Sequence, residues 1–177
     1  MPTTSVPTSP PVPPTKPTDN AASSHQVTGS LREQLEATYA AIGDSFKEPT
    51  PDTYLSLIDA KDKTPDMIQK LQKNWADPEI KQMFKQATFP GLAGTNFVDA
   101  RQQGDYAAYY FISDPQDTNY LTIEVIRFHQ TNNIWQMSQR RNSTSIPIGA
   151  SAEENRQKTL REIESDPDLG LMPPMGA

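Results

Sequence analysis

The chain has 177 residues, of which 34% are hydrophobic, 17 are proline and none is cysteine, and its net charge at pH 7 is −6. The absence of cysteine excludes disulfides, thiolate metal sites and thiol nucleophiles. No segment carries the excess of lysine and arginine that binding to a phosphate backbone requires, so we expect no nucleic-acid partner. No apolar run approaches the roughly 18 residues of a membrane span. We therefore expect any attachment to a membrane to be made by an anchoring segment that is absent from this sequence, and not by residues 1–30.

Residues 1–30 form a segment rich in proline, threonine and serine that contains seven of the 17 prolines. Its apolar residues beyond alanine are Met1, Val6, Val12 and Val27, too few to offset the entropy lost on ordering the backbone. We predict a disordered tether. Tethers of this composition are common behind a removed signal or lipid anchor, which favours the bacterial cell envelope or periplasm as the location.

Residues 31–87 carry apolar side chains at helical spacing. Ser30 and Glu33 have the spacing of a capping box, and a stripe of apolar residues follows with steps of three or four, as on an amphipathic helix. Further start signals at 51–52, 64–66 and 77–79 predict three shorter helices. The stripe consists of Leu31, Leu35, Tyr39, Ile42 and Phe46.

From residue 95 onward the apolar residues alternate as in strands, over 95–102, 105–113, 119–130 and 133–140. The loops between these segments are short, which implies antiparallel neighbours. In the third segment one face is clearly apolar, with Leu121, Ile123 and Val125 at alternate positions. The predicted fold class is α+β: N-terminal helices packed as a single layer on a curved four-stranded antiparallel meander.

We place this domain at 31–149 and assign 150–177 to an acidic tail. A short helix over 151–164 is marginal unless it docks, because Leu160 and Ile163 are its only large apolar residues. Two interpretations of the last residues remain open. They are either a disordered terminus or a linear segment whose Leu169, Leu171 and Met172 enter a groove on a protein partner.

Two short patterns carry a family resemblance. They are the helix start Asp52-Thr53-Tyr54 and the closing strand Asn133-Ile134-Trp135-Gln136-Met137. Over 31–140 the chain resembles the cystatin-like cone fold of nuclear-transport-factor-like and ketosteroid-isomerase-like proteins, and most of all the small bacterial envelope lipoprotein domains built on it. The resemblance implies a sheet wrapped around the first helix, with a cavity at the wide end of the cone. It transfers no catalytic residue to this sequence.

Two carboxylates are weak catalytic candidates, Glu124 in the third strand and Asp99 in the first. A carboxylate inside an apolar cone has its pKa raised by desolvation and becomes a general base. The alternative for Glu124 is a cross-strand ion pair with Arg101 or Arg127 on the wetter face. That ordinary pairing is favoured.

Four aromatic residues are candidates for ligand binding: Tyr109, Tyr110, Tyr120 and Trp135. A phenol offers an apolar body and one hydrogen-bonding tip, although the same residues also suit a core. Tyr109 and Tyr110 are adjacent in a strand and must point to opposite faces, so at most one of them lines a given cavity.

No cofactor or metal is expected, because His129 has no companion ligands in the sequence. The adjacent pair Arg140 and Arg141 is interpreted as a solvated strand end. Three functions stay open: a non-catalytic envelope-associated binding or assembly module for a protein or small apolar ligand, an isomerase-like or cyclase-like enzyme using a cavity carboxylate, and a homodimerising scaffold subunit. Of these three, the binding module is favoured over an enzyme.

Overall fold

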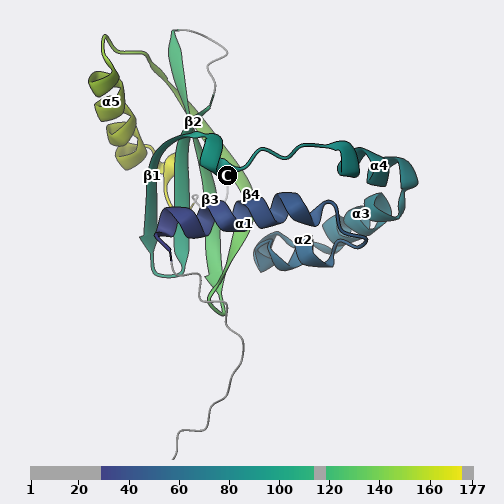
Figure 1. The fold of residues 1–177 in the computed structure, drawn as a ribbon. Helices are drawn as coiled ribbons and strands as arrows, with labels where there is room; N and C mark the ends of the chain where they lie inside the picture. The colour runs from purple at the N-terminus through teal and green to yellow at the C-terminus, as the bar shows by residue number, and fades with distance from the viewer. Residues whose placement is uncertain (1–28, 114–118, 173–177) are drawn as a thin grey trace, which may run out of the picture.

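The computed structural model describes residues 29–113 and 119–172. All but the last two residues of the predicted tether lie outside these ranges. The predicted fold class is confirmed: helices pack on a four-stranded antiparallel sheet in the order β1-β2-β3-β4. Helices α1 to α4 lie on one side of this sheet and α5 lies on the other (Figure 1).

Helix α1 (Leu31–Ser45) begins where the sequence predicts. The Ser30 hydroxyl accepts from the Glu33 backbone N–H at 3.3 Å, and the Glu33 carboxylate accepts from the Ser30 N–H at 2.8 Å. This capping box satisfies two N–H groups that a helix start leaves free. Among the described residues no helix combines the length and apolar character needed to cross a membrane.

Three shorter helices follow, and all three start where the sequence predicts. Thr64 caps α3 and Asp77 caps α4, each through its side-chain oxygen and each followed by a proline at the first helical position. The 3-10 helix η1 (Ala60–Asp62) lies between α2 and α3, and η2 (Leu92–Gly94) precedes the sheet. The helix bounds are α2 Asp52–Ser56, α3 Pro65–Ala76 and α4 Pro78–Gln86.

The sheet is a meander of β1 (Asn96–Gln103), β2 (Tyr106–Ser113), β3 (Tyr120–Thr131) and β4 (Ile134–Pro147). Asn132 and Asn133 both have positive φ, 52° and 61°, which is the backbone of a tight hairpin turn. Strand β4 runs seven residues past its predicted end at 140. Its second half is rich in serine, threonine and asparagine, so the apolar alternation that marks a strand is missing there although the pairing with β3 continues.

Two irregularities shape β4. Ile126 pairs with Arg141 and Phe128 with Met137, so the single residue Arg127 of β3 faces a bulge of three residues, 138–140, in β4. On its other edge β4 pairs with the chain before η1: Met137 N–H donates to Leu57 O at 2.7 Å, and the N–H of residue 59 donates back to Met137 O at 3.0 Å.

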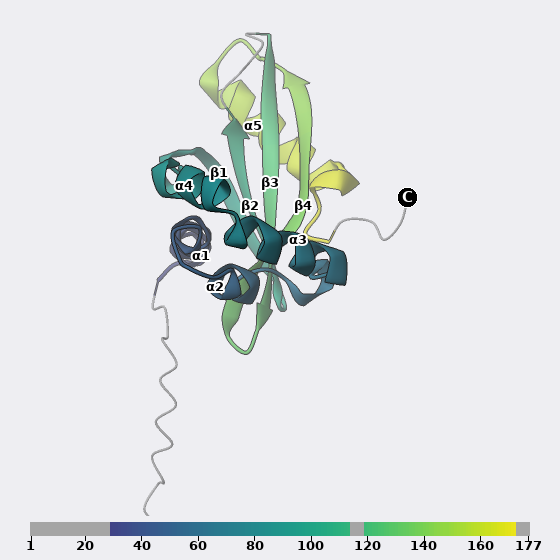
Figure 2. The same ribbon diagram turned by 90° about the vertical axis from the view of Figure 1, so that its right-hand side faces the viewer.

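The face of the sheet that lies under α1 to α4 (Figure 2) is called here the α1 face. It carries the larger core. Side chains of α1, α2 and α3 meet those that point out of the sheet on this side. The buried residues are Leu35, Ile42, Tyr54, Ile58, Trp75, Leu92, Ala107, Tyr109, Phe111, Ile126, Phe128, Trp135 and Met137.

The opposite face, the α5 face, is covered by α5 (Ala152–Ser165) and by η3 (Pro167–Leu169). The structure therefore has a second layer where the chain length suggested only one layer of helices. The segment that forms this layer, α5 with η3, is so polar that its sequence does not predict a buried face. Its only buried side chains are Thr159, Ile163 and Leu169. The core on this face consists of Ala108, Tyr110, Ile123, Val125, Ile146, Ile163 and Leu169.

Candidate functional site

Tyr109 is fully buried on the α1 face, and its hydroxyl is used inside the protein. The hydroxyl donates to Glu36 Oε1 at 2.8 Å and has Leu92 O at 3.2 Å as a second acceptor. Burial raises the pKa of the Tyr109 phenol. This residue therefore anchors α1 to the sheet, and it lines neither of the two pockets described below.

The other three aromatic candidates are also outside those pockets. Tyr110 points to the α5 face, as the strand alternation requires, and its hydroxyl donates to Leu169 O at 2.7 Å. Trp135 is buried on the α1 face and its indole N–H donates to Gln34 Oε1 at 3.0 Å. Tyr120 is 45% exposed at the start of β3.

The two candidate carboxylates, Asp99 and Glu124, line neither pocket. The Asp99 carboxylate accepts from Arg101 Nε at 2.8 Å and from the Ala100 N–H at 2.9 Å, so an ordinary ion pair occupies it. Glu124 faces Phe111 and Ser143 across the sheet and is half-buried. The predicted ion pair of Glu124 with Arg101 or Arg127 is absent among the described residues. Glu124 is paired with Phe111 of the α1-face core, whereas both arginines are paired with Ala108 of the α5-face core, so they point to the other side of the sheet.

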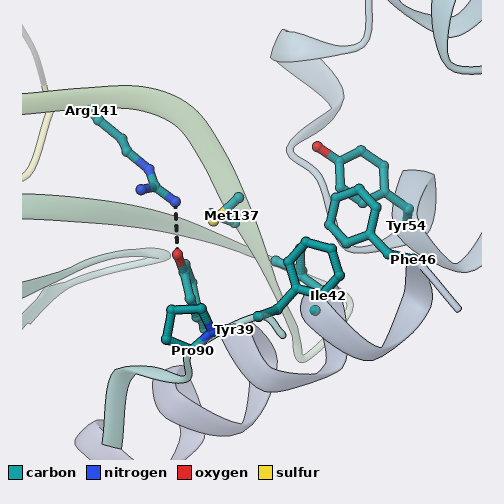
Figure 3. A pocket seen from close by; sticks show the side chains of 9 residues that line it. Tyr39, Ile42, Phe46, Tyr54, Pro90, Met137 and Arg141 are labelled. Carbon is teal, nitrogen blue, oxygen red and sulfur yellow. Dashed lines mark hydrogen bonds between the residues drawn. The ribbon is translucent and has the colours of Figure 1, made fainter. Parts of the chain in front are cut away.

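The α1 face opens into a pocket of about 260 Å³, called here the apolar pocket (Figure 3). Helices α1 and α2 form one wall, the end of the loop before η2 forms a second, and β4 closes the third. The lining residues are Tyr39, Ile42, Gly43, Phe46, Tyr54, Phe89, Pro90, Met137 and Arg141.

Aromatic packing holds the walls of the apolar pocket in place. Phe46 lies at the centre of a cluster, with ring centroids 5.1 Å from Tyr54, 5.5 Å from Trp75, 5.0 Å from Phe84 and 4.6 Å from Phe89. Such contacts between aromatic rings are favourable beyond the area that they bury. Trp75 and Phe84 stand behind Phe46 and support the wall without lining the pocket.

Arg141 brings the only charged side chain among the residues that line the apolar pocket. Its Nη2 donates to the Tyr39 hydroxyl at 2.9 Å, and its guanidinium carbon lies 5.7 Å from the centre of the Tyr39 ring (Figure 3). Within the described part of the chain no carboxylate forms an ion pair with it. The pocket therefore presents an apolar, aromatic interior with one uncompensated positive charge at its edge.

Tyr54 adds a buried phenol to the same wall. Burial raises its pKa, although the hydroxyl accepts a hydrogen bond from Gln139 Nε2 at 3.1 Å. The phenol is neutral at physiological pH, since its ordinary pKa is near 10 and the shift is upward. It therefore contributes a polar atom to the wall and no charge.

A second pocket, of about 170 Å³, lies on the α5 face and is called here the polar pocket. It forms where five segments meet: η1, the start of β2, the last residues of β3, the bulge in β4 and the residues after η3. The lining residues are Asp59, Lys61, Asp62, Tyr106, Arg127, Phe128, His129, Ser138, Arg140, Leu171 and Met172.

The pair Arg140 and Arg141 thus contributes one arginine to each pocket. The two side chains therefore point to opposite faces of the sheet. The signal of this pair was present in the sequence as the only adjacent pair of basic residues. Its meaning was missed because β4 was predicted to end at this point.

No group of three or more His, Asp or Glu side chains in the described ranges is arranged to hold a metal ion. Neither a protein-family model nor a curated protein matches this sequence. The assignment of function therefore starts from the two pockets.

Proposed function

We propose that the domain is a non-catalytic binding module that takes a small, largely apolar molecule with an acidic end into the apolar pocket. The observation that carries this proposal is a pocket walled by four aromatic rings with the uncompensated charge of Arg141 at its edge. Ligand pockets are commonly apolar with a few polar groups that fix orientation. An aromatic or acyl body would contact the rings, and an acid group would meet the guanidinium.

The size of the pocket limits the ligand. A volume of about 260 Å³ lies just below the range of roughly 300–1,000 Å³ usual for ligand pockets. A single ring or a short acyl chain fits this space, whereas a steroid-sized molecule does not. The ligand class is therefore a small carboxylic acid with an apolar body.

The lining favours binding over proton transfer. A cavity base of the isomerase type needs a carboxylate or histidine within hydrogen-bond reach of the substrate. No Asp, Glu or His is among the residues that line the apolar pocket, and Asp99 and Glu124 lie elsewhere. The enzyme alternative has no observation of this kind in its favour.

Titration with octanoate and with 1-octanol, followed by calorimetry and by amide chemical shifts, tests the proposal. We expect octanoate to bind with a dissociation constant of about 0.1–1 mM and 1-octanol to bind about tenfold more weakly, because the alcohol lacks the charge-assisted contact. Arg141→Gln should reduce the octanoate affinity to that of the alcohol and leave 1-octanol unchanged.

Two further variants make this test specific. Arg140→Gln removes the neighbouring arginine from the opposite face and should leave octanoate binding unaltered. Gly43→Leu should fill the pocket, since even a Cβ added at position 43 would lie 3.1 Å from Phe89 Cβ. Binding that survives both Arg141→Gln and Gly43→Leu in folded protein would show that the apolar pocket is not the site.

We also propose, from the sequence patterns, that this is a cone-fold domain of the nuclear-transport-factor-like type acting in the bacterial envelope. The absence of cysteine and the proline-rich segment 1–30 support that location. Fractionation of cells of the source organism would test it, and recovery of the protein with the cytosol would overturn it. The scaffold alternative would need a free sheet face for pairing, and α5 covers one of the two faces.

A further inference from the structure

The polar pocket on the α5 face is lined by three cations and by two carboxylates, Asp59 and Asp62. The cations are Lys61, Arg127 and Arg140, and the ring of His129 also lines the pocket. The pocket is separated from the apolar pocket by the sheet. Its chemistry therefore calls for an explanation independent of the proposed function.

Both carboxylates that line the polar pocket are occupied by other groups. Asp62 Oδ2 accepts from the Gln139 N–H at 2.8 Å and from the Ser138 hydroxyl at 3.1 Å, so it supports the bulge in β4. Asp59 is 5% exposed, and its Oδ1 accepts from the Lys61 N–H at 3.2 Å and lies 3.3 Å from His129 Nδ1. Neither carboxylate forms an ion pair with an arginine or lysine side chain in the described residues.

The cations differ in how they are held. Arg127 is 2% exposed and donates to Gly170 O and Asn142 Oδ1, each at 2.7 Å, and to Asp168 O. Its charge is therefore solvated by neutral acceptors alone. Burial lowers the pKa of Arg127, and the nearby charge of Arg140 lowers it further.

Arg140 and Lys61 are the cations of this pocket that remain available. The Arg140 guanidinium makes no hydrogen bond or ion pair within the described ranges. The positive charge that it lies near is that of Arg127. Lys61 Nζ donates one hydrogen bond, to the Tyr106 hydroxyl at 2.9 Å, and an ammonium has three donors. Two cations with free donors therefore line the same pocket, and charge-assisted hydrogen bonds from such donors bind an oxyanion.

The pocket also has aromatic and aliphatic lining residues. The rings of Tyr106 and His129 are stacked, with centroids 4.6 Å apart and planes 12° apart. Leu171 and Met172 also line the pocket, and Met172 is 58% exposed. Stacked rings and flexible apolar side chains in one pocket suit contact with a planar group.

We propose that the polar pocket binds a small oxyanion, a carboxylate or phosphate, carried on a flat apolar group. Arg140 and Lys61 hold the oxyanion, and the flat group contacts the ring pair Tyr106–His129 and the side chains of Leu171 and Met172. The site is distinct from the apolar pocket, and each site draws one arginine from the pair 140–141.

The test uses four probes on the full chain: phenyl phosphate, benzoate, inorganic phosphate and acetate. We expect phenyl phosphate or benzoate to bind with a dissociation constant of about 0.1–1 mM, and each to bind about three- to tenfold more tightly than its counterpart without a ring. The stronger of the two aromatic probes identifies the oxyanion. Amide shifts should concentrate at 59–62, 127–129 and 138–140.

Two substitutions separate this site from the apolar pocket. Arg140→Gln and Lys61→Gln should each weaken the aromatic probe about tenfold, because each removes a charge-assisted hydrogen bond. Arg141→Gln should weaken octanoate and leave unchanged the amide shifts that the aromatic probe causes at 59–62, 127–129 and 138–140. These variants change exposed side chains, so we expect them to fold.

Three results would overturn the proposal. They are no binding of any probe in the millimolar range, equal affinity for the probes with and without a ring, and unchanged affinity in Arg140→Gln. Failure here with intact octanoate binding would leave the proposed function standing. The reverse result would remove the proposed function and keep this site.

Discussion

The two faces of the sheet are covered in different ways. On the α1 face, helices bury a continuous layer of large side chains that includes the cluster around Phe46 and the tryptophans Trp75 and Trp135. On the α5 face, a smaller aliphatic core is supplemented by two side chains of the sheet, Arg127 and Tyr110, that bind backbone carbonyls of residues 168–170.

The difference shows two physical routes to a second layer. Apolar area that is distributed over many residues makes α1 to α4 part of the cooperative unit. A short segment that depends on a few polar contacts is expected to open locally, at a lower free energy than global unfolding. The α5 layer should therefore detach before the α1 layer.

The largest expected effect comes from the α1 face. Leu35→Ala removes a fully buried side chain and should lower the free energy of unfolding by about 2–5 kcal/mol. Denaturant unfolding and hydrogen exchange would measure it, with faster exchange over the whole domain. The matched variant Ile163→Ala should speed exchange mainly over 152–169. Equal effects on all amides in both variants would contradict the comparison.

Arg127→Met should have the next largest effect. It removes three hydrogen bonds from a buried guanidinium and should cost about 2–3 kcal/mol, because bonds to a charged donor are strong but the freed carbonyls regain water. Loss of exchange protection confined to 166–172 would support the local role. Arg127→Lys is the control and should restore little, since an ammonium lacks the planar fork of donors.

The adjacent tyrosines offer a matched pair with a smaller effect. Tyr110→Phe and Tyr109→Phe each delete one hydroxyl on opposite faces and should each cost about 1 kcal/mol. The first should loosen residues 167–170 alone, and the second should loosen α1 through Glu36. Exchange rates measured amide by amide distinguish the two, and an interchange of the affected regions would refute the assignment of faces.

The smallest effect is a pH dependence at the start of α5. A hydrogen bond with Lys158, helped by the Ala150 N–H, lowers the pKa of Glu154 below its ordinary value. A lowered pKa in the folded state gives stability that is present above the ordinary carboxyl range and is lost as the pH falls through the folded-state pKa. The difference in unfolding free energy between the wild type and Glu154→Gln should therefore shrink on acidification; a difference that grows would contradict it.

The sequence was sufficient for the helical half and for the meander, because caps such as Ser30 and Thr64 and the alternation in β3 are local signals. It was insufficient for the α5 layer, where the decisive residue is Arg127. A basic side chain inside a strand is ordinarily expected at a solvated position. Its partners are main-chain oxygens, which have no sequence signature.

The candidate site was predicted less well than the fold. Tyr109, Tyr110 and Trp135 were candidates because aromatic residues suit both pockets and cores, and periodicity does not tell these apart. Residues that do line the apolar pocket, such as Tyr39 and Phe46, were recognised only as members of a helical stripe. Arg140 and Arg141 gain their roles from the bulge at 138–140, which depends on Asp62 far away in the sequence.

The short pairing of residues 57–59 with β4 limits how copies of this chain could join. An open sheet edge offers free N–H and C=O groups that template intermolecular β-structure. Here Leu57 and Asp59 occupy the Met137 backbone groups, and the bulge beside it interrupts the remaining edge. At Met137 the outer edge of β4 is therefore closed to pairing with a strand of another copy.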